Sequence, residues 1–289
     1  MTTSLNAKAG TYSFDSNFIV NRLGYGTMQL TGKGTWGPYN NPKQAEEVIE
    51  KAVSLGVNLI DTADTYGPWF ADRYLAEALK NIPKEKQPFI SDKVGQVRRG
   101  PDIWQPLGDP KYLRQEEETS LMTLGKDHVD LLFLHRIDPN FTIKEQVGEI
   151  KKFQDEGKAK HIGLSQVTVK QIKEAEKYAK IDAVENYYNI AHHVDDDVVN
   201  YTESHGMAFI PYFPLGSGKL LRSDSPLSSF AKKYQASNAQ IALAWLLKRS
   251  KNMLPIPGTS SIDHLKNNLS AASIELEDED FKKLSNLSK

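Results

Sequence analysis

The feature that most limits how this 289-residue sequence can fold is a regular alternation of short apolar runs with amphipathic stretches of helical period. Counting from Leu23, we find eight predicted strands, each followed by a predicted helix. Runs that are apolar throughout, such as residues 131–134, are typical of parallel strands buried on both faces. Eight such units in a chain of this length favour a closed (β/α)8 TIM barrel over an open doubly wound sheet.

The remaining boundaries follow from the same periodicity and from turn residues. After the first strand, the predicted strands cover residues 57–60, 88–94, 129–134, 161–164, 183–185, 208–211 and 252–256. The predicted helices cover residues 42–55, 69–79, 109–124, 142–156, 168–179, 195–205, 238–249 and 263–271, with extra helical sequence at the C-terminus, near 278–287. The pattern of residues 13–20 predicts an N-terminal β-hairpin, and that of residues 214–227 predicts an irregular segment. We expect a single barrel domain over residues 1–289, because no linker divides the sequence.

Composition narrows the classes of partner. Lys and Arg total 36 and Asp and Glu total 37, so the net charge of −1 provides no field that would attract nucleic acid or an anionic membrane. The absence of cysteine excludes disulfides, thiolate metal sites and cysteine nucleophiles. No N-terminal leader or spanning apolar run is apparent. We therefore expect a cytoplasmic enzyme that acts on a small molecule.

Four ionisable residues stand at or just beyond the ends of three consecutive predicted strands. Asp61 ends the second strand and Tyr66 follows it closely, while Lys93 and His135 end the third and fourth. Each residue alone has a commoner structural role, such as a turn carboxylate or a surface lysine. In a barrel, however, the active site lies at the C-terminal ends of the strands, and neighbouring strands are about 4.8 Å apart. We therefore predict that the four side chains form one site.

The chemistry of these four groups suits the reduction of an aldehyde or ketone. A nearby ammonium at Lys93 would favour the phenolate of Tyr66 and so help the phenol to give up a proton. Asp61 would supply the counter-charge to the lysine, and a neutral His135 could orient the carbonyl oxygen. The hydride itself would have to come from a cofactor.

Several motifs in these segments resemble the aldo-keto reductase superfamily, in that family's order from Gly24 to about Asn268. They are Ile60-Asp-Thr-Ala-Asp-Thr-Tyr-Gly67, Ser91-Asp-Lys-Val-Gly95, Leu132-Phe-Leu-His135, Gly163-Leu-Ser165, Pro214-Leu-Gly216 and Ile256-Pro-Gly-Thr259. The resemblance is strongest to the bacterial branch with the sequence Ile256-Pro-Gly-Thr-Ser-Ser, whose activities include reduction of small aldehydes such as pyridoxal.

The resemblance implies that Asp61, Tyr66, Lys93 and His135 form a catalytic tetrad, with Tyr66 as the general acid. It also implies NADPH as the cofactor, with NADH as the alternative. Ser165 and Gln166 would bind the nicotinamide carboxamide, and Tyr212 would stack on the nicotinamide ring. All residues implied to contact the cofactor are Gly26, Thr27, Met28, Asp61, Ser165, Gln166, Glu185, Tyr212, Phe213, Pro214, Leu215, Gly216, Ser217, Lys219, Ile256, Gly258, Thr259, Ser260, His264, Asn267 and Asn268.

Some of these positions depart from the family's pattern. Glu185 stands where the family commonly has a glutamine, and a carboxylate cannot donate to the carboxamide oxygen. We hypothesise that its charge favours the oxidised, cationic nicotinamide. Gly258 and His264 replace the Lys and Arg that many members use to bind the 2′-phosphate, although Lys266 could compensate. NADPH remains the cofactor that the resemblance implies.

Other functions remain to be weighed against reduction. Lys93 could instead be the nucleophile of a Schiff-base lyase, or the chain could be a low-turnover, cofactor-sensing regulatory subunit. Residues 32–37 match G-x-G-x-x-G, but no helix follows directly, so we expect a loop over the substrate site, with Trp36 and Trp69 lining the pocket. No metal is expected, and neither the substrate nor the oligomeric state follows from the sequence.

Overall fold

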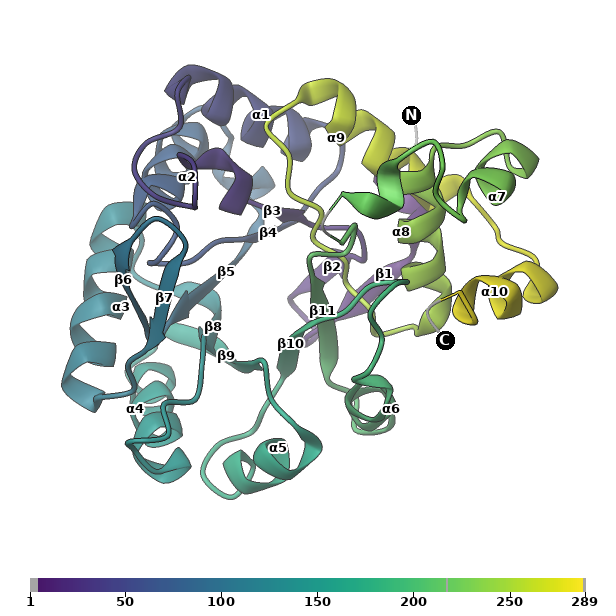
Figure 1. The fold of residues 1–289 in the computed structure, drawn as a ribbon. Coiled ribbons are helices and arrows are strands. Elements are labelled where there is room, and N and C mark those ends of the chain that lie inside the picture. Colours follow the sequence, from purple (N-terminus) through teal and green to yellow (C-terminus); the bar gives the residue numbers. More distant parts are fainter. Residues whose placement is uncertain (1–4, 217, 288–289) are drawn as a thin grey trace.

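The computed structural model describes residues 5–216 and 218–287, apart from the side chains of Leu5, Ala7 and Lys219. Its centre is a seven-stranded sheet in which every neighbouring pair of strands is parallel (Figure 1). In sheet order the strands are β3 (Tyr25–Gly26), β4 (Leu59–Asp61), β5 (Phe89–Val94), β8 (Val129–Leu134), β9 (Ala159–Ser165), β10 (Ala183–Tyr187) and β11 (Ala208–Tyr212).

The sheet closes into a barrel through residues 252–256. On one side of this segment, the Phe209 amide donates to the Asn252 carbonyl over 2.9 Å and the Leu254 amide donates to the Phe209 carbonyl over 2.8 Å. On the other side, the Gly24 amide donates to the Pro255 carbonyl over 2.9 Å. The eighth predicted strand is therefore an extended segment with a single bridge, and Pro255, which lacks an N–H donor, prevents a longer ladder. The (β/α)8 barrel is confirmed.

The helices lie around the strands (Figure 1). They are α1 (Pro42–Ser54), α2 (Phe70–Lys80), α3 (Pro110–Leu124), α4 (Ile143–Asp155), α5 (Val169–Ala175), α6 (Asp196–Ser204), α7 (Ser228–Lys233), α8 (Asn238–Arg249), α9 (Ile262–Leu269) and α10 (Asp278–Ser285). Capping boxes begin three of them, where Thr142, Thr168 and Ser237 accept hydrogen bonds from the backbone three residues on. The predicted helices are confirmed, except that α5 ends four residues early and α7 was not predicted.

A β-hairpin covers the N-terminal end of the barrel. Its strands are β1 (Thr11–Ser13) and β2 (Ile19–Asn21), close to the predicted positions. Phe14, between them, stacks on Phe89 at the start of β5 with ring centroids 4.6 Å apart. Because this end is filled with aromatic side chains, the opposite end of the barrel is the one available for a site.

A second hairpin, which the sequence analysis missed, follows β5. Its strands are β6 (Gln96–Gly100) and β7 (Ile103–Pro106). In β6 the buried positions are taken by Gln96, Arg98 and Gly100, so the usual pattern of buried apolar residues is absent. This hairpin stands at the C-terminal end of the strands, next to the predicted site.

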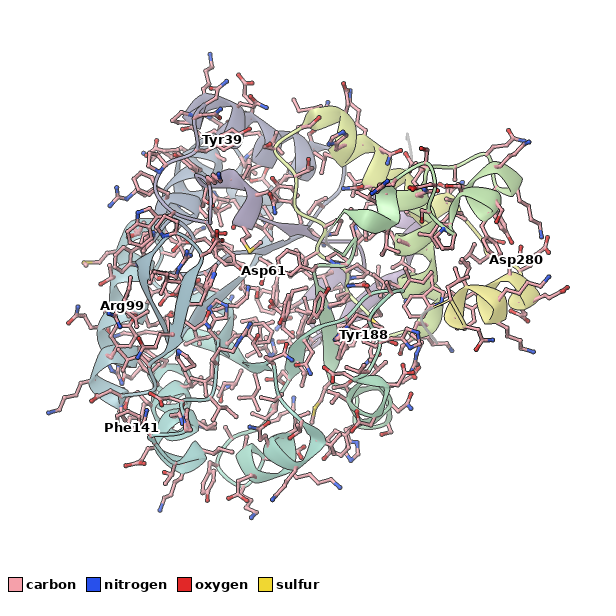
Figure 2. All side chains as sticks on the ribbon, viewed as in Figure 1. Tyr39, Asp61, Arg99, Phe141, Tyr188 and Asp280 are labelled. Carbon is pink, nitrogen blue, oxygen red and sulfur yellow. The ribbon has the colours of Figure 1, made fainter. Side chains whose placement is uncertain are left out.

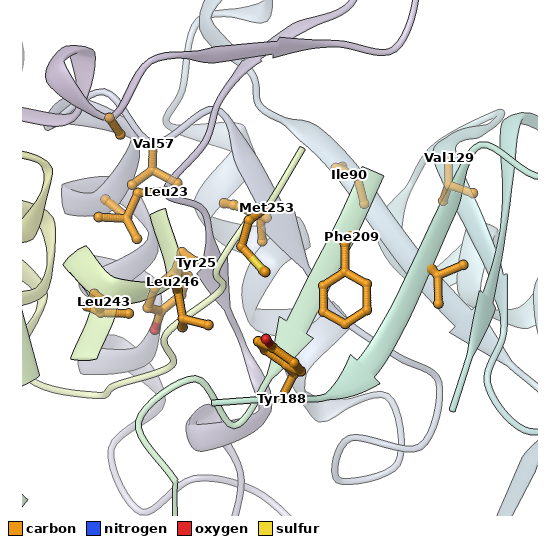
Figure 3. Packing of buried hydrophobic residues seen from close by; sticks show 14 of the residues in the cluster. Leu23, Tyr25, Val57, Ile90, Val129, Tyr188, Phe209, Leu243, Leu246 and Met253 are labelled. Carbon is orange, nitrogen blue, oxygen red and sulfur yellow. The ribbon is translucent and has the colours of Figure 1, made fainter. Parts of the chain in front are cut away.

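The main core fills the space between the strands and the helices. Figure 3 shows part of it, with Tyr188 and Phe209 packed edge to face at 5.4 Å and Leu246 and Met253 nearby. Within the described ranges, no helix is long and apolar enough to cross a membrane.

Candidate active site

The strands bring the four predicted catalytic residues together at the C-terminal end of the barrel. Asp61 is the last residue of β4, Lys93 is the penultimate residue of β5, and His135 directly follows β8. Tyr66 lies in the turn after β4, where its amide donates to the Ala63 carbonyl over 3.0 Å. Their exposed fractions are between 0% and 6%, and Figure 2 places Asp61 near the middle of the barrel.

Lys93 is held by two carboxylates. Its Nζ forms an ion pair with Asp61, donates to the Thr62 carbonyl over 2.9 Å, and lies 3.3 Å from Oε2 of Glu185. Burial opposes the charged form, but the charges of Asp61 and Glu185 raise the pKa of Lys93 above its usual value. Lys93 is therefore a fixed ammonium at neutral pH.

Glu185 is the second acid beside this lysine. It is 2% exposed, and burial, together with the negative charge of Asp61, raises its pKa to about 8. Two carboxylates facing one ammonium would leave a net negative charge in a buried place, which is costly. Glu185 therefore carries a proton at neutral pH.

Tyr66 and His135 lie beside the lysine. The Lys93 ammonium is 5.4 Å from the centre of the Tyr66 ring, and the Tyr66 and His135 ring centroids are 6.2 Å apart. Burial raises the pKa of Tyr66, and the opposing effect of Lys93 is smaller. The phenol therefore stays protonated and can act as a proton donor. The sequence predicted that Lys93 would favour the phenolate, but burial outweighs this effect and the pKa of Tyr66 lies above its usual value.

His135 is a neutral imidazole. Burial, followed by the charge of Arg136, lowers its pKa well below the usual value. Thr65 Oγ1 lies 3.4 Å from His135 Nδ1, which leaves Nε2 as the nitrogen available to a ligand.

Two cavities meet at Tyr66. The first, of about 350 Å³, runs between β3, the segment after β11 and residues 256–258. The second, of about 380 Å³, lies between the hairpin β6–β7 and the ends of β8 and β10. Both are lined by Met28, Tyr66, Tyr212 and Phe213. A cofactor in one cavity and a substrate in the other would therefore share the phenol.

Many of the residues predicted to contact the cofactor line the first cavity. These are Gly26, Met28, Asp61, Tyr212, Phe213, Pro214, Leu215, Gly216, Ile256 and Gly258. Glu185 lines the second cavity instead. Ser217 lies outside the described residues, as does the side chain of Lys219.

The other predicted contacts lie beyond the lining of this cavity. Thr27 is buried and donates to the Asp61 carbonyl over 3.1 Å, and the Thr259 carbonyl accepts from the Tyr25 hydroxyl over 2.6 Å. Asn267 donates to Ser237 Oγ over 3.0 Å. The remaining ones are Ser165, Gln166, Ser260, the exposed His264 and the buried Asn268. Their roles stay predictions.

The side chains predicted to bind the carboxamide are engaged with neighbours. Ser165 Oγ accepts a hydrogen bond from Arg136 over 2.8 Å, and Gln166 Oε1 accepts one from the Tyr212 hydroxyl over 2.6 Å. Gln166 has a φ of 54°, in the left-handed region that an asparagine adopts more readily.

The tryptophan that lines the second cavity is Trp104 of β7, and neither Trp36 nor Trp69 lines either of the two cavities. The Trp104 ring meets the Tyr66 and His135 rings edge to face, at 6.5 and 6.4 Å. Residues 32–37 form a loop, as predicted, and contribute Thr35 to this cavity.

Arg98 organises the walls of the second cavity. Its guanidinium stacks 3.5 Å from the Trp104 ring centre and donates to five backbone carbonyls. The carbonyls belong to Gly34, Thr35, Thr65, Gly100 and Ile103. One side chain thus joins the loop 32–37, the turn that carries Tyr66 and the hairpin β6–β7.

Sequence reasoning missed Gln96, Trp104 and Arg136, which also line the second cavity. A usable signal was present for two of them. Gln96 and Arg136 follow Lys93 and His135 by three residues and one residue, so they too lie at the ends of adjacent strands.

Comparison with known proteins agrees with this architecture. A family model described as the aldo/keto reductase family matches residues 22–289, and the chain therefore belongs to the aldo/keto reductase family. It is 44% identical over 278 residues to an uncharacterized oxidoreductase of Schizosaccharomyces pombe, covering 96% of this chain and 90% of the other.

The chain is also similar to an enzyme with a named reaction, the pyridoxine 4-dehydrogenase of Escherichia coli. The two are 41% identical over 277 residues, which is 93% of this chain and 96% of the relative. A crystal structure of an aldo-keto reductase from Klebsiella pneumoniae in complex with NADPH shares the fold, with a TM-score of 0.82 at 22% identity over 96% of this chain and 94% of the other.

Proposed function

We propose that this protein reduces small aldehydes or ketones to alcohols with NADPH, and that Tyr66 donates the proton. The observation that carries the proposal is the buried group of Asp61, Lys93, Tyr66 and His135 beside the junction of the two cavities. A protonated phenol, an ammonium and a neutral imidazole are the groups needed where a carbonyl oxygen becomes negative.

Each side chain then has a defined task. Tyr66 transfers its proton to the carbonyl oxygen as negative charge develops there. Lys93, fixed by Asp61, stabilises the tyrosinate that remains. His135 holds the carbonyl oxygen by a hydrogen bond and does not itself change protonation state.

The first cavity fits a nicotinamide cofactor. Its walls are mainly apolar side chains and the backbone of glycines 26, 216 and 258, with Gln29 and Asp61 as polar members, and the Tyr212 ring forms one side, where a flat ring could stack. Ser165 and Gln166 would hold the carboxamide, and the bound group would supply the hydride. NADPH is favoured by the resemblance, although the residue at the adenosine end is His264 where many members have arginine.

The second cavity supports an aromatic aldehyde as substrate. Trp104, Tyr212 and Phe213 give it flat apolar walls. The similarity to an Escherichia coli pyridoxine 4-dehydrogenase makes pyridoxal the first substrate to test.

The test is NADPH oxidation against a panel of aldehydes that includes benzaldehyde and pyridoxal. Tyr66→Phe should lower kcat by about 10²- to 10⁴-fold, the usual contribution of a general acid, while NADPH still binds. Tyr178→Phe is the matched control, because Tyr178 lies in the turn after α5 and lines neither cavity, and this variant should behave like the unmodified protein. Equal turnover by Tyr66→Phe and the unmodified protein would refute this mechanism.

The two alternatives are less well supported. A Schiff-base lyase needs a neutral lysine, whereas the pKa of Lys93 is raised, against the effect of burial, by Asp61 and Glu185. A low-turnover regulatory subunit would bind NADPH but fail to oxidise it with any aldehyde of the panel. A cytoplasmic location is part of the proposal.

A further inference from the structure

An arginine without an acidic partner faces the second cavity. Arg136 follows His135 directly, and its Nη1 donates to the His135 carbonyl over 2.6 Å and to Ser165 Oγ over 2.8 Å. Its Nη2 lies 3.5 Å from the Tyr212 hydroxyl. Among the residues that the structure describes, no carboxylate lies within 4.0 Å of the guanidinium. A half-buried cation of this kind gains most from an anionic ligand.

A second polar group in the same cavity also lacks a partner. Gln96 is 4% exposed, and its side-chain oxygen has no hydrogen-bond partner in the described part of the chain. An unsatisfied buried amide is costly, so a ligand that supplies a donor would relieve that cost. Its backbone is fixed, because the Tyr112 hydroxyl donates to the Gln96 carbonyl over 2.7 Å.

The charges around the cavity leave Arg136 as its dominant cation. Lys93 is balanced by Asp61, and Glu185 is protonated at neutral pH. The other carboxylate of the lining, Asp102, is exposed at the tip of the hairpin β6–β7. The aromatic walls described above favour a flat ring between these polar groups.

We propose that Arg136 selects aromatic aldehydes that carry an ionised oxygen on the ring carbon next to the formyl-bearing carbon, and that Gln96 accepts a hydrogen bond from a second ring substituent. The inference rests on the carbonyl reduction proposed above. It names the class of substrate, the ortho-oxido aromatic aldehydes.

The ortho position follows from where the guanidinium lies. Arg136 is bound to the backbone of His135, the residue proposed to hold the carbonyl oxygen. After burial, its charge is the next largest influence on the pKa of His135 and lowers it. An oxygen ortho to the formyl group lies beside the carbonyl oxygen and can reach this cation, whereas a para oxygen points away across the ring. Pyridoxal meets both conditions, with an ionisable oxygen on one side of its formyl group and a hydroxymethyl group on the other.

The experiment compares kcat/KM for 2-hydroxybenzaldehyde and 2-methoxybenzaldehyde, since only the first can ionise. The 4-hydroxy and 4-methoxy pair corrects for the electronic effect of an oxygen anion on the carbonyl. For each pair, the ratio of hydroxy to methoxy kcat/KM is calculated per ionised phenol at pH 7, where Glu185 keeps its proton. In the unmodified protein, the ortho ratio should exceed the para ratio by about 10- to 100-fold, the range expected of a charge-assisted hydrogen bond. This comparison needs no variant.

Substitution then assigns the effect to Arg136. Arg136→Gln should bring the ortho ratio down to the para ratio, and Arg136→Lys should keep part of the difference. Arg99→Gln, an exposed arginine of β6, is the matched control and should leave both ratios unchanged. Gln96→Leu should lower kcat/KM for pyridoxal more than for 3-hydroxy-2-methylpyridine-4-carbaldehyde, which lacks only the hydroxymethyl group.

The outcomes separate the two proposals. Reduction of benzaldehyde with equal ortho and para ratios would overturn the role of Arg136 and leave carbonyl reduction standing. Failure to reduce any of the aldehydes would overturn both. An ortho preference that disappears in Arg136→Gln and survives in part in Arg136→Lys supports the inference.

Discussion

Replacing Glu185 by glutamine should make the stability of the protein less dependent on pH. The folded protein holds the Glu185 proton up to about pH 8, whereas an unfolded chain loses it near the usual value of 4.5. Over that interval the folded state binds more protons, so the free energy of unfolding falls as the pH rises. The loss is about 1.4 kcal/mol per pH unit, or at most about 3 kcal/mol between pH 5 and pH 7.5. Glutamine has the same shape and does not titrate.

Thermal unfolding at pH 5.0 and 7.5 measures this effect. In a chain of this size the difference in Tm between Glu185→Gln and the unmodified protein should grow by about 6 °C over that range, in favour of the variant. Other buried acids whose pKa values are raised by burial, such as Asp72 and Glu117, contribute equally to both proteins and cancel. Glu203→Gln, on the exposed face of α6, is the control. A constant difference in Tm at both pH values would refute the assignment of the proton to Glu185.

Two further predictions concern the same end of the barrel. The ratio of NADP⁺ affinity to NADPH affinity, measured by quenching of tryptophan fluorescence, should rise as the pH passes 8 and Glu185 ionises. The ratio should not change with pH in Glu185→Gln, and a rise in both proteins would exclude Glu185 as the cause. Arg98→Lys should raise KM for aldehydes about tenfold and lower Tm by several degrees, because an ammonium cannot reach the five carbonyls that the guanidinium joins. Arg99→Lys is its control, and an unchanged KM in Arg98→Lys would show that the loop 32–37 is placed by other contacts.

The periodicity of the sequence predicted the barrel and three of the four central residues for the same physical reason. Parallel strands buried on both faces are apolar throughout, so their ends are visible as the point where polar residues begin. Asp61, Lys93 and His135 stand at such points, and barrel closure alone brings these ends together. These three positions therefore needed no knowledge of the loops, whereas Tyr66 lies in the turn after β4.

The features that were missed depend on contacts between loops. Arg98 of the hairpin β6–β7 is buried because its guanidinium donates to carbonyls of other segments, those of Thr35 and Thr65. A local pattern of apolar residues cannot reveal such contacts. Trp36 and Trp104 could not be ranked from the sequence, because each is a tryptophan in a polar stretch. Residues 252–256 were predicted as a strand since the run is apolar, but Pro255 restricts it to isolated ladder bonds.

Charge balance links the two cavities. With Glu185 protonated, the positive charge of Lys93 is cancelled by Asp61, so the cation that an incoming substrate meets is Arg136. When Glu185 ionises, its negative charge appears on the wall of the substrate cavity, where it opposes an anionic substrate and favours a cationic ring in the neighbouring cavity. A single buried proton would then set both the charge of substrate that the protein accepts and the redox state of cofactor that it holds. A glutamine at position 185 would leave these two preferences independent of pH, because it carries no proton to lose.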